Sequence, residues 1–257
     1  MGSSDFSDSL KYVEMTDWLE RTVEGVTVFE PARVPAGLRV ALSDRGMAPE
    51  GEASPTAFLA RRFADAIGLS KIPIVRATQV HGNAAAVIRE APGMGEIRDA
   101  GECDILATAL PGVALVVQTA DCVPIVLTGQ RAVGVVHAGW RGSAQRAAAS
   151  GVKALVSLDE KPQELAAWLG PSIRSCCYEV GGEVAAQFAG DFVRADCGGK
   201  FHLDLAAVNR SQLEFSGVSP ERIAVHPACT LCGGKKFASF RRDGPRAGRM
   251  ITLVARN

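Results

Sequence analysis

Short, continuous apolar runs separated by turns most constrain what this chain can fold into. Three of them follow one another near the middle of the sequence: Val113 to Thr119, Ile125 to Leu127 and Ala132 to Val136. Strands that are buried on both faces give such runs. Helical spacing also occurs, for example from Thr56 to Gly68, where Gly68 fits a C-terminal cap. Because strands and helices alternate irregularly, we predict an α+β fold, a single domain with a mixed β-sheet core flanked by helices.

The remaining patterns extend this prediction along the chain. We predict strands over residues 72–80, 84–88, 103–107, 165–169 and 223–226, a terminal hairpin of 238–241 with 249–254, and helices from Gly142 or Ser143 to about Leu155, over 183–188 and over 204–215. Residues 43–46, 49–54 and 92–101 have the composition of loops.

No linker divides the 257 residues, and one large domain accounts for a chain of this length. The start of the chain is rich in serine, aspartate and glycine and shows weak periodicity. We therefore predict a mobile N-terminal segment over residues 1–25 and a single domain over residues 26–257.

The charge balance limits the kinds of partner. The chain has 28 Lys and Arg against 28 Asp and Glu, so its formal net charge is zero. Nucleic-acid binding needs a concentrated basic face, and we expect no nucleic-acid partner. One short basic cluster is adequate for a small anion, and it comprises Lys235, Lys236, Arg241, Arg242, Arg246 and Arg249.

Cysteine usage and the N-terminal composition bear on the compartment. The seven cysteines are an odd number without regular disulfide spacing, and Met1 to Met15 is polar and acidic, unlike a secretory signal. No window approaches the roughly 20 apolar residues of a membrane span. We expect a reducing, cytoplasmic location without a membrane partner, where thiols are free to bind metal.

Two of the four histidines and one cysteine each end a short apolar strand beside glycine or another small residue. They are His81 before Gly82, Cys122, and His137 two residues before Gly139. Thiolate and imidazole suit zinc, and three ligands leave a fourth position for water, phosphate or substrate. Histidines beside glycine are also structural, and buried cysteines are usually inert, so spacing alone leaves both interpretations open.

Several segments carry a resemblance to a known family. They are Gln79-Val80-His81-Gly82, Ala120-Asp121-Cys122-Val123-Pro124, His137-Ala138-Gly139-Trp140-Arg141-Gly142, Gly170-Pro171-Ser172-Ile173 leading to Cys177-Tyr178-Glu179-Val180, and Phe240-Arg241-Arg242-Asp243-Gly244 with Gly248-Arg249. Together they resemble the signature of the YfiH-like laccase-domain family, over roughly residues 40 to 255. Members have been called polyphenol oxidases and, more recently, purine nucleoside phosphorylases.

The resemblance implies a zinc enzyme whose small-molecule partners are purine nucleosides and phosphate. Family members phosphorolyse adenosine, inosine, guanosine and 5′-methylthioadenosine, and they deaminate adenosine. Carried over by position, His81, Cys122 and His137 are the expected metal ligands and catalytic residues. The domain over residues 26–257 would then be a laccase-domain-type catalytic domain, as a monomer or weak homo-oligomer.

Other residues are candidates for binding substrate. Arg141 is the fourth expected catalytic residue, since it closely follows a ligand and is able to clamp phosphate through a bidentate contact; the alternative is a surface residue at a helix start. Arg45 lies where the family usually has an arginine near a Gly-Gly turn, although the segment Asp44-Arg45-Gly46-Met47 departs from that pattern. Gln79 and Arg242 lie in matched segments. We predict that all three contact substrate. Asp121 would point away from Cys122 in a regular strand.

The pair Cys229 and Cys232 forms a CxxC motif. A structural zinc site would need a second pair, and Cys176-Cys177 lacks the spacing to supply one. A redox motif would need a thioredoxin-like setting. We therefore expect cysteines that pack in loops near the site. His202 and His226 are expected to be ordinary polar residues, and Trp140 either packs against a base or fills the core.

Other functions remain as alternatives. A copper-dependent polyphenol oxidase (laccase) would bind copper at the same three ligands, but reduction of dioxygen to water needs several coppers and more histidines than this chain has. A peptidoglycan-editing hydrolase would use the same metal on a peptide-like substrate. A scaffold that holds metal and binds partners would turn over no nucleoside.

Overall fold

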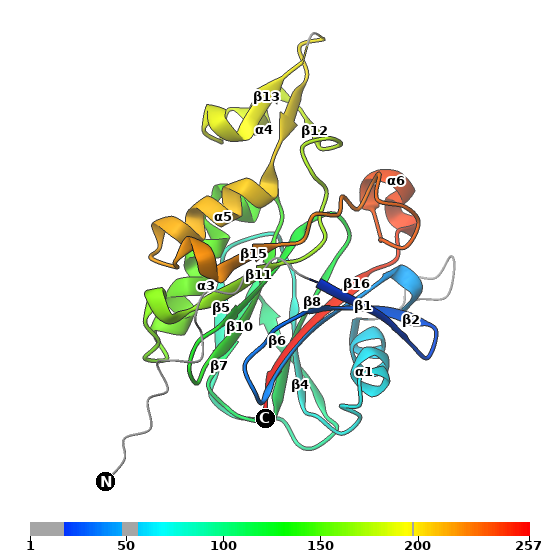
Figure 1. Ribbon diagram of the computed structural model, residues 1–257, viewed down its shortest axis with the longest axis vertical. Helices are drawn as coiled ribbons and strands as arrows, with labels where there is room; N and C mark the ends of the chain where they lie inside the picture. Colours follow the sequence, from blue (N-terminus) through cyan, green and yellow to red (C-terminus); the bar gives the residue numbers. More distant parts are fainter. Residues whose placement is uncertain (1–17, 48–55, 197) are drawn as a thin grey trace.

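Two large β-sheets face each other, and helices cover the outer face of each (Figure 1). A computed structural model describes residues 18–47, 56–196 and 198–257. Helix α1 (Thr56–Ala66) covers the seven-stranded sheet, and α3 (Ala147–Val156) and α5 (Leu205–Phe215) cover the six-stranded sheet. The predicted α+β class is confirmed, and its β-core consists of two sheets.

The seven-stranded sheet is mixed. Its order is β1 (Trp18–Val23), β2 (Val26–Pro31), β3 (Leu38–Ser43), β16 (Met250–Arg256), β8 (Val113–Thr119), β4 (Ile74–Thr78) and β6 (Ile97–Glu102). Strand β4 runs parallel to both β8 and β6, whereas the other pairs are antiparallel.

The six-stranded sheet is also mixed. Its order is β15 (Ile223–Val225), β11 (Ala166–Leu169), β9 (Val123–Thr128), β10 (Val133–Ala138), β7 (Ile105–Thr108) and β5 (Ala85–Ile88). A small third sheet, at the top of Figure 1, contains β12 (Glu179–Val180), β14 (Phe201–Leu203) and β13 (Val193–Ala195).

The other helical segments are short. They are α2 (Trp140–Ala144), α4 (Gly182–Ala185), α6 (Phe240–Asp243), and the 3-10 turns η1 (Arg45–Met47), η2 (Pro162–Glu164), η3 (Gly190–Phe192), η4 (Pro220–Arg222) and η5 (Gly244–Arg246). Within the described ranges, no helix combines the length and the apolar character that a membrane span requires.

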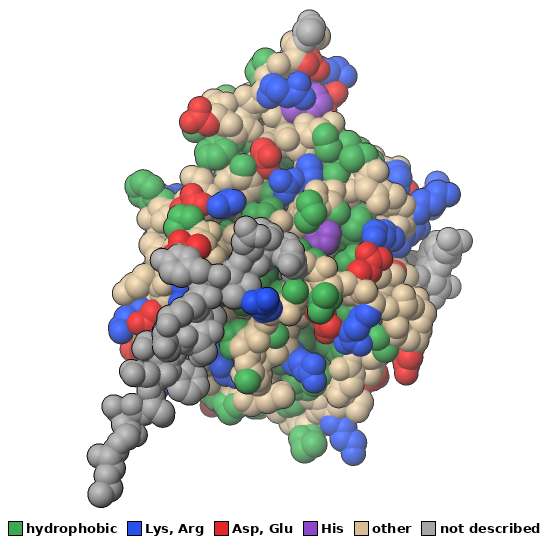
Figure 2. Space-filling view, viewed as in Figure 1, with side chains coloured by type: hydrophobic (Ala, Val, Ile, Leu, Met, Phe, Trp, Pro, Cys, Tyr) green, Lys and Arg blue, Asp and Glu red, His purple; other side chains and the backbone are tan. Residues whose placement is uncertain are grey.

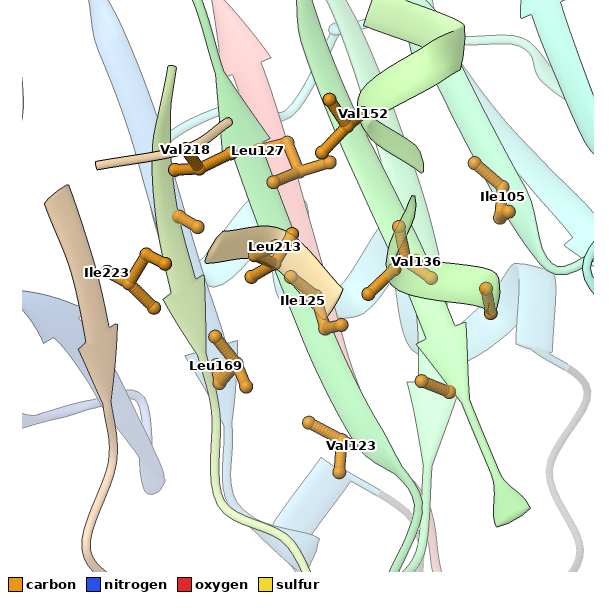
Figure 3. Packing of buried hydrophobic residues seen from close by; sticks show 14 of the residues in the cluster. Ile105, Val123, Ile125, Leu127, Val136, Val152, Leu169, Leu213, Val218 and Ile223 are labelled. Atoms are coloured by element: carbon orange, nitrogen blue, oxygen red, sulfur yellow. The ribbon is translucent and has the colours of Figure 1, made fainter. Parts of the chain in front are cut away.

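Strand residues alternate between two apolar layers, which explains the continuous apolar runs. In β8, Leu115 points between the two sheets while Val116 packs under α1. In β9, Val126 points between the sheets, and Ile125 and Leu127 pack under α3 and α5 (Figure 3). Because both faces of these strands are covered, neither carries the polar alternation of a half-exposed sheet.

Several predicted elements need correction. Residues 18–23, assigned to the mobile start, form the edge strand β1, which pairs with β2 over its whole length; residues 1–17 lie outside the described ranges, and the domain start at residue 26 stays a prediction. Part of the predicted loop 92–101 belongs to β6, whose polar residues lie at a sheet edge. The predicted loop over 49–54 also lies outside the described ranges.

Two further predictions fail near the ends of β10 and of the chain. The helix after His137 begins at Trp140 and breaks at Arg146, whose φ is +65°. The terminal hairpin is wrong, because residues 240–243 form α6 and β16 pairs instead with β3 and β8 in the middle of a sheet. The predicted helix from Thr56 and its Gly68 cap, with φ +82°, are confirmed.

Candidate metal centre

The candidate centre lies where the chain crosses from one large sheet to the other. His81 lies in the crossing from β4 to β5, Cys122 in the crossing from β8 to β9, and His137 near the end of β10. Their ligand atoms all lie within 4.8 Å of one another. The structure therefore brings together the three residues that the sequence selected, although 56 positions separate the first from the last.

The crossings bend sharply at the ligands. His81 has φ +61° and Asp121, beside Cys122, has φ +86°. Residues other than glycine rarely adopt these left-handed conformations, and they persist only where the surroundings hold them. At His81, the carboxylate of Asp104 holds the conformation, because it accepts hydrogen bonds from the backbone N–H groups of residues 80, 81 and 82.

Asp104 also orients a second ligand. It lies in the crossing from β6 to β7, is fully buried, and accepts a 2.7 Å hydrogen bond from Nδ1 of His137. Burial opposes the charge of Asp104, but the hydrogen bonds from His137 and the backbone of residues 80 and 82 hold its pKa below the usual value. The bond from Nδ1 leaves Nε2 of His137 free to bind metal.

No role was predicted for Asp104 from the sequence. A carboxylate directly before a buried apolar strand is the signal that would have found it, because such a charge needs partners.

Cys122 and His137 affect one another's ionisation. Burial opposes both charges, but each charge stabilises the other, so the pKa of the Cys122 thiol is lowered to about 6 and that of His137 is raised to about 9. The thiolate is the form that binds metal, and His137 would release its proton on binding.

Glycines after His137 allow the ligands to approach. A Cβ at Gly139 would lie 3.0 Å from Cδ2 of His81 and 3.1 Å from Sγ of Cys122. A Cβ at Gly142 would clash with the carbonyl oxygen of Gly82. Steric crowding therefore explains why residues 139 and 142 are glycine, since the first turn of α2 packs against both other ligand segments.

Two positive side chains lie beside the centre. Arg141 is exposed, its guanidinium lies 4.4 Å from the centre of the Trp140 ring, and its side chain makes no hydrogen bond or ion pair to any other residue that the structure describes. Arg241 lies 5.3 Å over the ring of Tyr178. Burial first, and then the charge of Cys122, raise the pKa of Tyr178 to about 12. This phenol therefore stays protonated and can donate a hydrogen bond.

Asp121 lies in the bend between β8 and β9, outside a regular strand, and has φ +86°. Its carboxylate accepts hydrogen bonds from Oγ1 of Thr230 at 2.6 Å and from the backbone N–H of Arg241 at 2.7 Å. It therefore ties the Cys122 crossing to the chain around residues 230 and 241. Neither Thr230 nor Tyr178 was given a role by the sequence, because only the fold brings them here.

The structure places the other predicted substrate residues differently. The amide of Gln79 is bonded at both ends to the backbone of Gln118, at 2.8 Å each. Arg242 donates to the carbonyl of Phe237 at 2.7 Å and pairs with Asp243, which also meets Arg45 at 3.5 Å. These contacts join chain segments, and whether the three side chains also touch substrate stays a prediction.

The basic cluster predicted from the sequence is largely on the surface. Figure 2 shows Lys and Arg side chains at the right-hand edge of the molecule, where Figure 1 places α6. Lys235, Lys236, Arg241 and Arg246 are exposed, while Arg242 is partly buried.

The expectation that Cys176-Cys177 lacks the spacing to supply a second pair for Cys229 and Cys232 is wrong. The sulfur atoms of Cys229 and Cys232 and those of Cys176 and Cys177 all lie within 4.8 Å of one another. Adjacent cysteines point to opposite sides in a strand, but these two lie in a turn closed by hydrogen bonds from the N–H groups of residues 177 and 178 to the carbonyl of Arg174. In this turn both sulfurs reach the same point.

His202 and His226 belong to neither group of candidate ligands among the described residues, as expected. Nδ1 of His202 lies 3.0 Å from the carbonyl oxygen of Ser175, and Nδ1 of His226 accepts from the N–H of Ala228. Trp140 is partly buried against the core under α3 and α5.

Known proteins with similar sequences include enzymes of nucleoside chemistry. The family model described as multi-copper polyphenol oxidoreductase laccase matches residues 54–257. A purine nucleoside phosphorylase of Deinococcus radiodurans is 38% identical over 225 residues, covering 85% of this chain and 82% of that protein. Adenosine deaminase RL5, from an unknown prokaryotic organism, is 36% identical over 251 residues, covering 92% and 96%.

Solved structures show the same architecture. YlmD from Geobacillus stearothermophilus superposes with a TM-score of 0.80 at 26% sequence identity, covering 95% of this chain and 100% of that one. Bacillus licheniformis YfiH superposes with a TM-score of 0.76 at 25% identity, covering 86% and 93%.

Proposed function

The chain belongs to the laccase-domain family, and from this premise we propose that it is a zinc-dependent purine nucleoside enzyme. Its reactions would be phosphorolysis of adenosine, inosine, guanosine and 5′-methylthioadenosine, together with deamination of adenosine. The observation that carries the proposal is the convergence of His81, Cys122 and His137 in a chain whose relatives include a purine nucleoside phosphorylase and an adenosine deaminase.

The residues present fit a zinc ion. Two imidazoles and one thiolate are ligands that zinc prefers, Asp104 fixes the tautomer of His137, and the bare backbone of Gly139 leaves room between the ligands. A zinc ion held there would supply Lewis-acid chemistry, by polarising water or binding an oxyanion at its open position.

The protein's own groups would bind and orient the substrates. Arg141, whose side chain lacks an ionic partner among the described residues, would bind phosphate through its planar guanidinium. The protonated Tyr178 would donate a hydrogen bond from its Oη to the purine ring, which gains electrons as the glycosidic bond breaks. Arg241 over the Tyr178 ring and Asp121 behind Cys122 would hold these groups in position.

The ligand inventory does not favour the oxidase that the family description names. Multi-copper reduction of dioxygen requires many histidine ligands, and this chain has four histidines. Two of them, His202 and His226, lie outside both ligand groups found in the described ranges. We therefore favour a mononuclear centre. We also propose that the protein is cytoplasmic and is a monomer or weak homo-oligomer.

The proposal is tested with zinc-loaded protein and adenosine, with and without phosphate. Separation of adenine, hypoxanthine and inosine reports each reaction: phosphate should accelerate adenine release, with ribose 1-phosphate as co-product, and inosine should form without phosphate. His137→Ala should abolish both, whereas His202→Ala, which changes a histidine outside the centre, should leave both. If the wild type turned over no nucleoside, the proposal would fail; adenosine deamination without a phosphate effect would reduce it to a deaminase.

A further inference from the structure

Four cysteines outside the His81, Cys122 and His137 centre form a second group of metal-type ligands. Cys176 and Cys177 lie in the turn between β11 and β12, and Cys229 and Cys232 lie in the segment between β15 and α6. Their sulfur atoms all lie within 4.8 Å of one another, and those of Cys176 and Cys232 are 3.7 Å apart.

These separations match a tetrathiolate zinc site. Zinc binds four thiolates as a tetrahedron with Zn–S bonds of about 2.3 Å, so neighbouring sulfurs lie about 3.8 Å apart along its edges. A disulfide requires a bond of about 2.05 Å between two sulfurs and gives no reason for two more to converge on them. The distance between Cys176 and Cys232 is therefore that of two ligands of one ion.

The backbone around Cys229 is shaped to gather sulfur atoms. The N–H of Gly233 donates to the carbonyl of Cys229 at 2.7 Å, and a Cβ at Gly233 would clash with that carbonyl oxygen. Gly234 follows with φ +98°. The N–H of Arg174 points at Sγ of Cys229 at 3.5 Å, as expected where a sulfur carries negative charge. Glycines thus close the CxxC turn tightly while an amide faces its first sulfur.

Positive charge lies next to this turn. Zinc with four thiolates carries a net charge of about −2, which needs nearby compensation. Arg242, which also pairs with Asp243, donates to the carbonyls of Thr230 and Gly234 at 3.2 and 3.5 Å, so its guanidinium is fixed against the CxxC segment. Lys235 follows in an exposed position.

We propose that Cys176, Cys177, Cys229 and Cys232 bind one zinc ion in a structural site separate from the first centre. All four positions of a tetrahedral ion would be filled by sulfur, which leaves none for substrate. Tetrahedral sulfur sites also suit iron, so the experiment below distinguishes the two metals.

The ion would fasten two segments that also border the first centre. The segments meet at a β-bridge between Ser172 and Cys229, and the N–H of Thr230 donates to the carbonyl of Ser172. From there, the N–H of Ile173 donates to the carbonyl of Asp121 and the hydroxyl of Thr230 donates to its carboxylate. The second ion would therefore hold in place the wall of the first centre beside Cys122.

The experiment removes the first centre and asks whether zinc remains. The full chain with His81→Ala, Cys122→Ala and His137→Ala keeps all four clustered cysteines, and it is purified without chelators. We expect about one zinc per chain by elemental analysis, and X-ray absorption at the zinc edge should show only sulfur neighbours at about 2.3 Å. Wild-type protein should hold about one zinc more, with nitrogen neighbours added.

A second pair of variants, in the wild-type background, locates the site. Cys229→Ser with Cys232→Ser should lose one zinc and leave the mixed nitrogen and sulfur shell of the first centre. Cys103→Ser, which alters a buried cysteine outside both groups, should lose none.

Three results would overturn the proposal. The first is that the triple variant binds no zinc, and the second is that it binds iron instead. The third is that the intact mass of the protein is lower by two hydrogens because two of the clustered cysteines have formed a disulfide. Should the Cys229→Ser and Cys232→Ser protein fail to fold, the absorption spectrum of the triple variant still decides, because its cysteine cluster is unchanged. Failure of nucleoside turnover would leave these measurements untouched.

Discussion

Asp104→Asn is the change that most directly tests how the first centre is held. The carboxylate accepts four hydrogen bonds, from Nδ1 of His137 and from the N–H groups of residues 80, 81 and 82, at 2.7 to 3.2 Å. Asparagine keeps the shape but only one accepting oxygen, so the two bonds on the other side are lost. Bonds to a charged group are worth about 1.5–3 kcal/mol each, which predicts a loss of roughly 3–6 kcal/mol in the free energy of unfolding.

Metal affinity should fall as well, because Asp104 orients His137. Loss of the partner that fixes a ligating histidine typically costs about 10- to 100-fold in metal affinity. Denaturant unfolding of the metal-free proteins measures the first effect, and zinc competition with a chromophoric chelator measures the second.

Glu160→Gln is the matched control. Glu160 is a buried carboxylate that accepts three backbone hydrogen bonds, from residues 130, 131 and 132, at 2.7 to 2.8 Å, but it touches no candidate ligand. The Glu160→Gln protein should have a lower free energy of unfolding than the wild type but the same zinc affinity. If Asp104→Asn kept wild-type zinc affinity at the first centre, or if both variants lost it equally, the orienting role of Asp104 would be refuted.

Three further changes test other parts of the reasoning. Gly139→Ala should weaken zinc binding with little change in metal-free stability, since its Cβ would lie 3.0 to 3.1 Å from two ligands; unchanged affinity would mean that the ligands move aside. Arg141→Lys should slow phosphorolysis by roughly one to two decades, because an ammonium cannot match the guanidinium fork, and deamination much less; equal loss of both would end its phosphate role. Burial, then Lys236, lowers the pKa of His226 to about 4, so its stabilising effect is complete above about pH 6.5 and is lost as the pH falls through 4, by about 3 kcal/mol in all. His226→Asn keeps an acceptor for Ala228 and should flatten the unfolding free energy over that pH range; an unaltered slope would assign it to other groups.

Secondary structure was predicted best from the sequence where burial gives a regular pattern of apolar residues. The interior strands β8, β9 and β10 and the helix α1 were found because apolar runs and helical spacing reflect their packing directly. Edge strands β1 and β6 were missed because their exposed faces allow polar residues. The partners of β16 could not be predicted, since pairing between strands more than a hundred residues apart leaves no local signal.

The first centre was found because each ligand has a recognisable neighbourhood, at a strand end beside a small residue. Its supports were not found, because Asp104, Tyr178 and Thr230 act only through contacts that the two-sheet fold creates. Gln79 shows the reverse: its position in a matched segment suggested a substrate contact, while its amide bonds to the backbone of Gln118 from a neighbouring strand end.

The two cysteine pairs show why spacing alone misled. A prediction from ligand spacing requires that the chain within each cysteine pair turns so that both sulfurs face one ion, as in the CxxC turn of Cys229 and Cys232. Cys176 and Cys177 are adjacent and would diverge in an extended chain, but the turn closed on the carbonyl of Arg174 directs both sulfurs to one side. The bridge between Ser172 and Cys229 then places the two loops against each other. Vicinal cysteines therefore become ligands through tertiary contacts, and a zinc count above one per chain is the measurement that would show it.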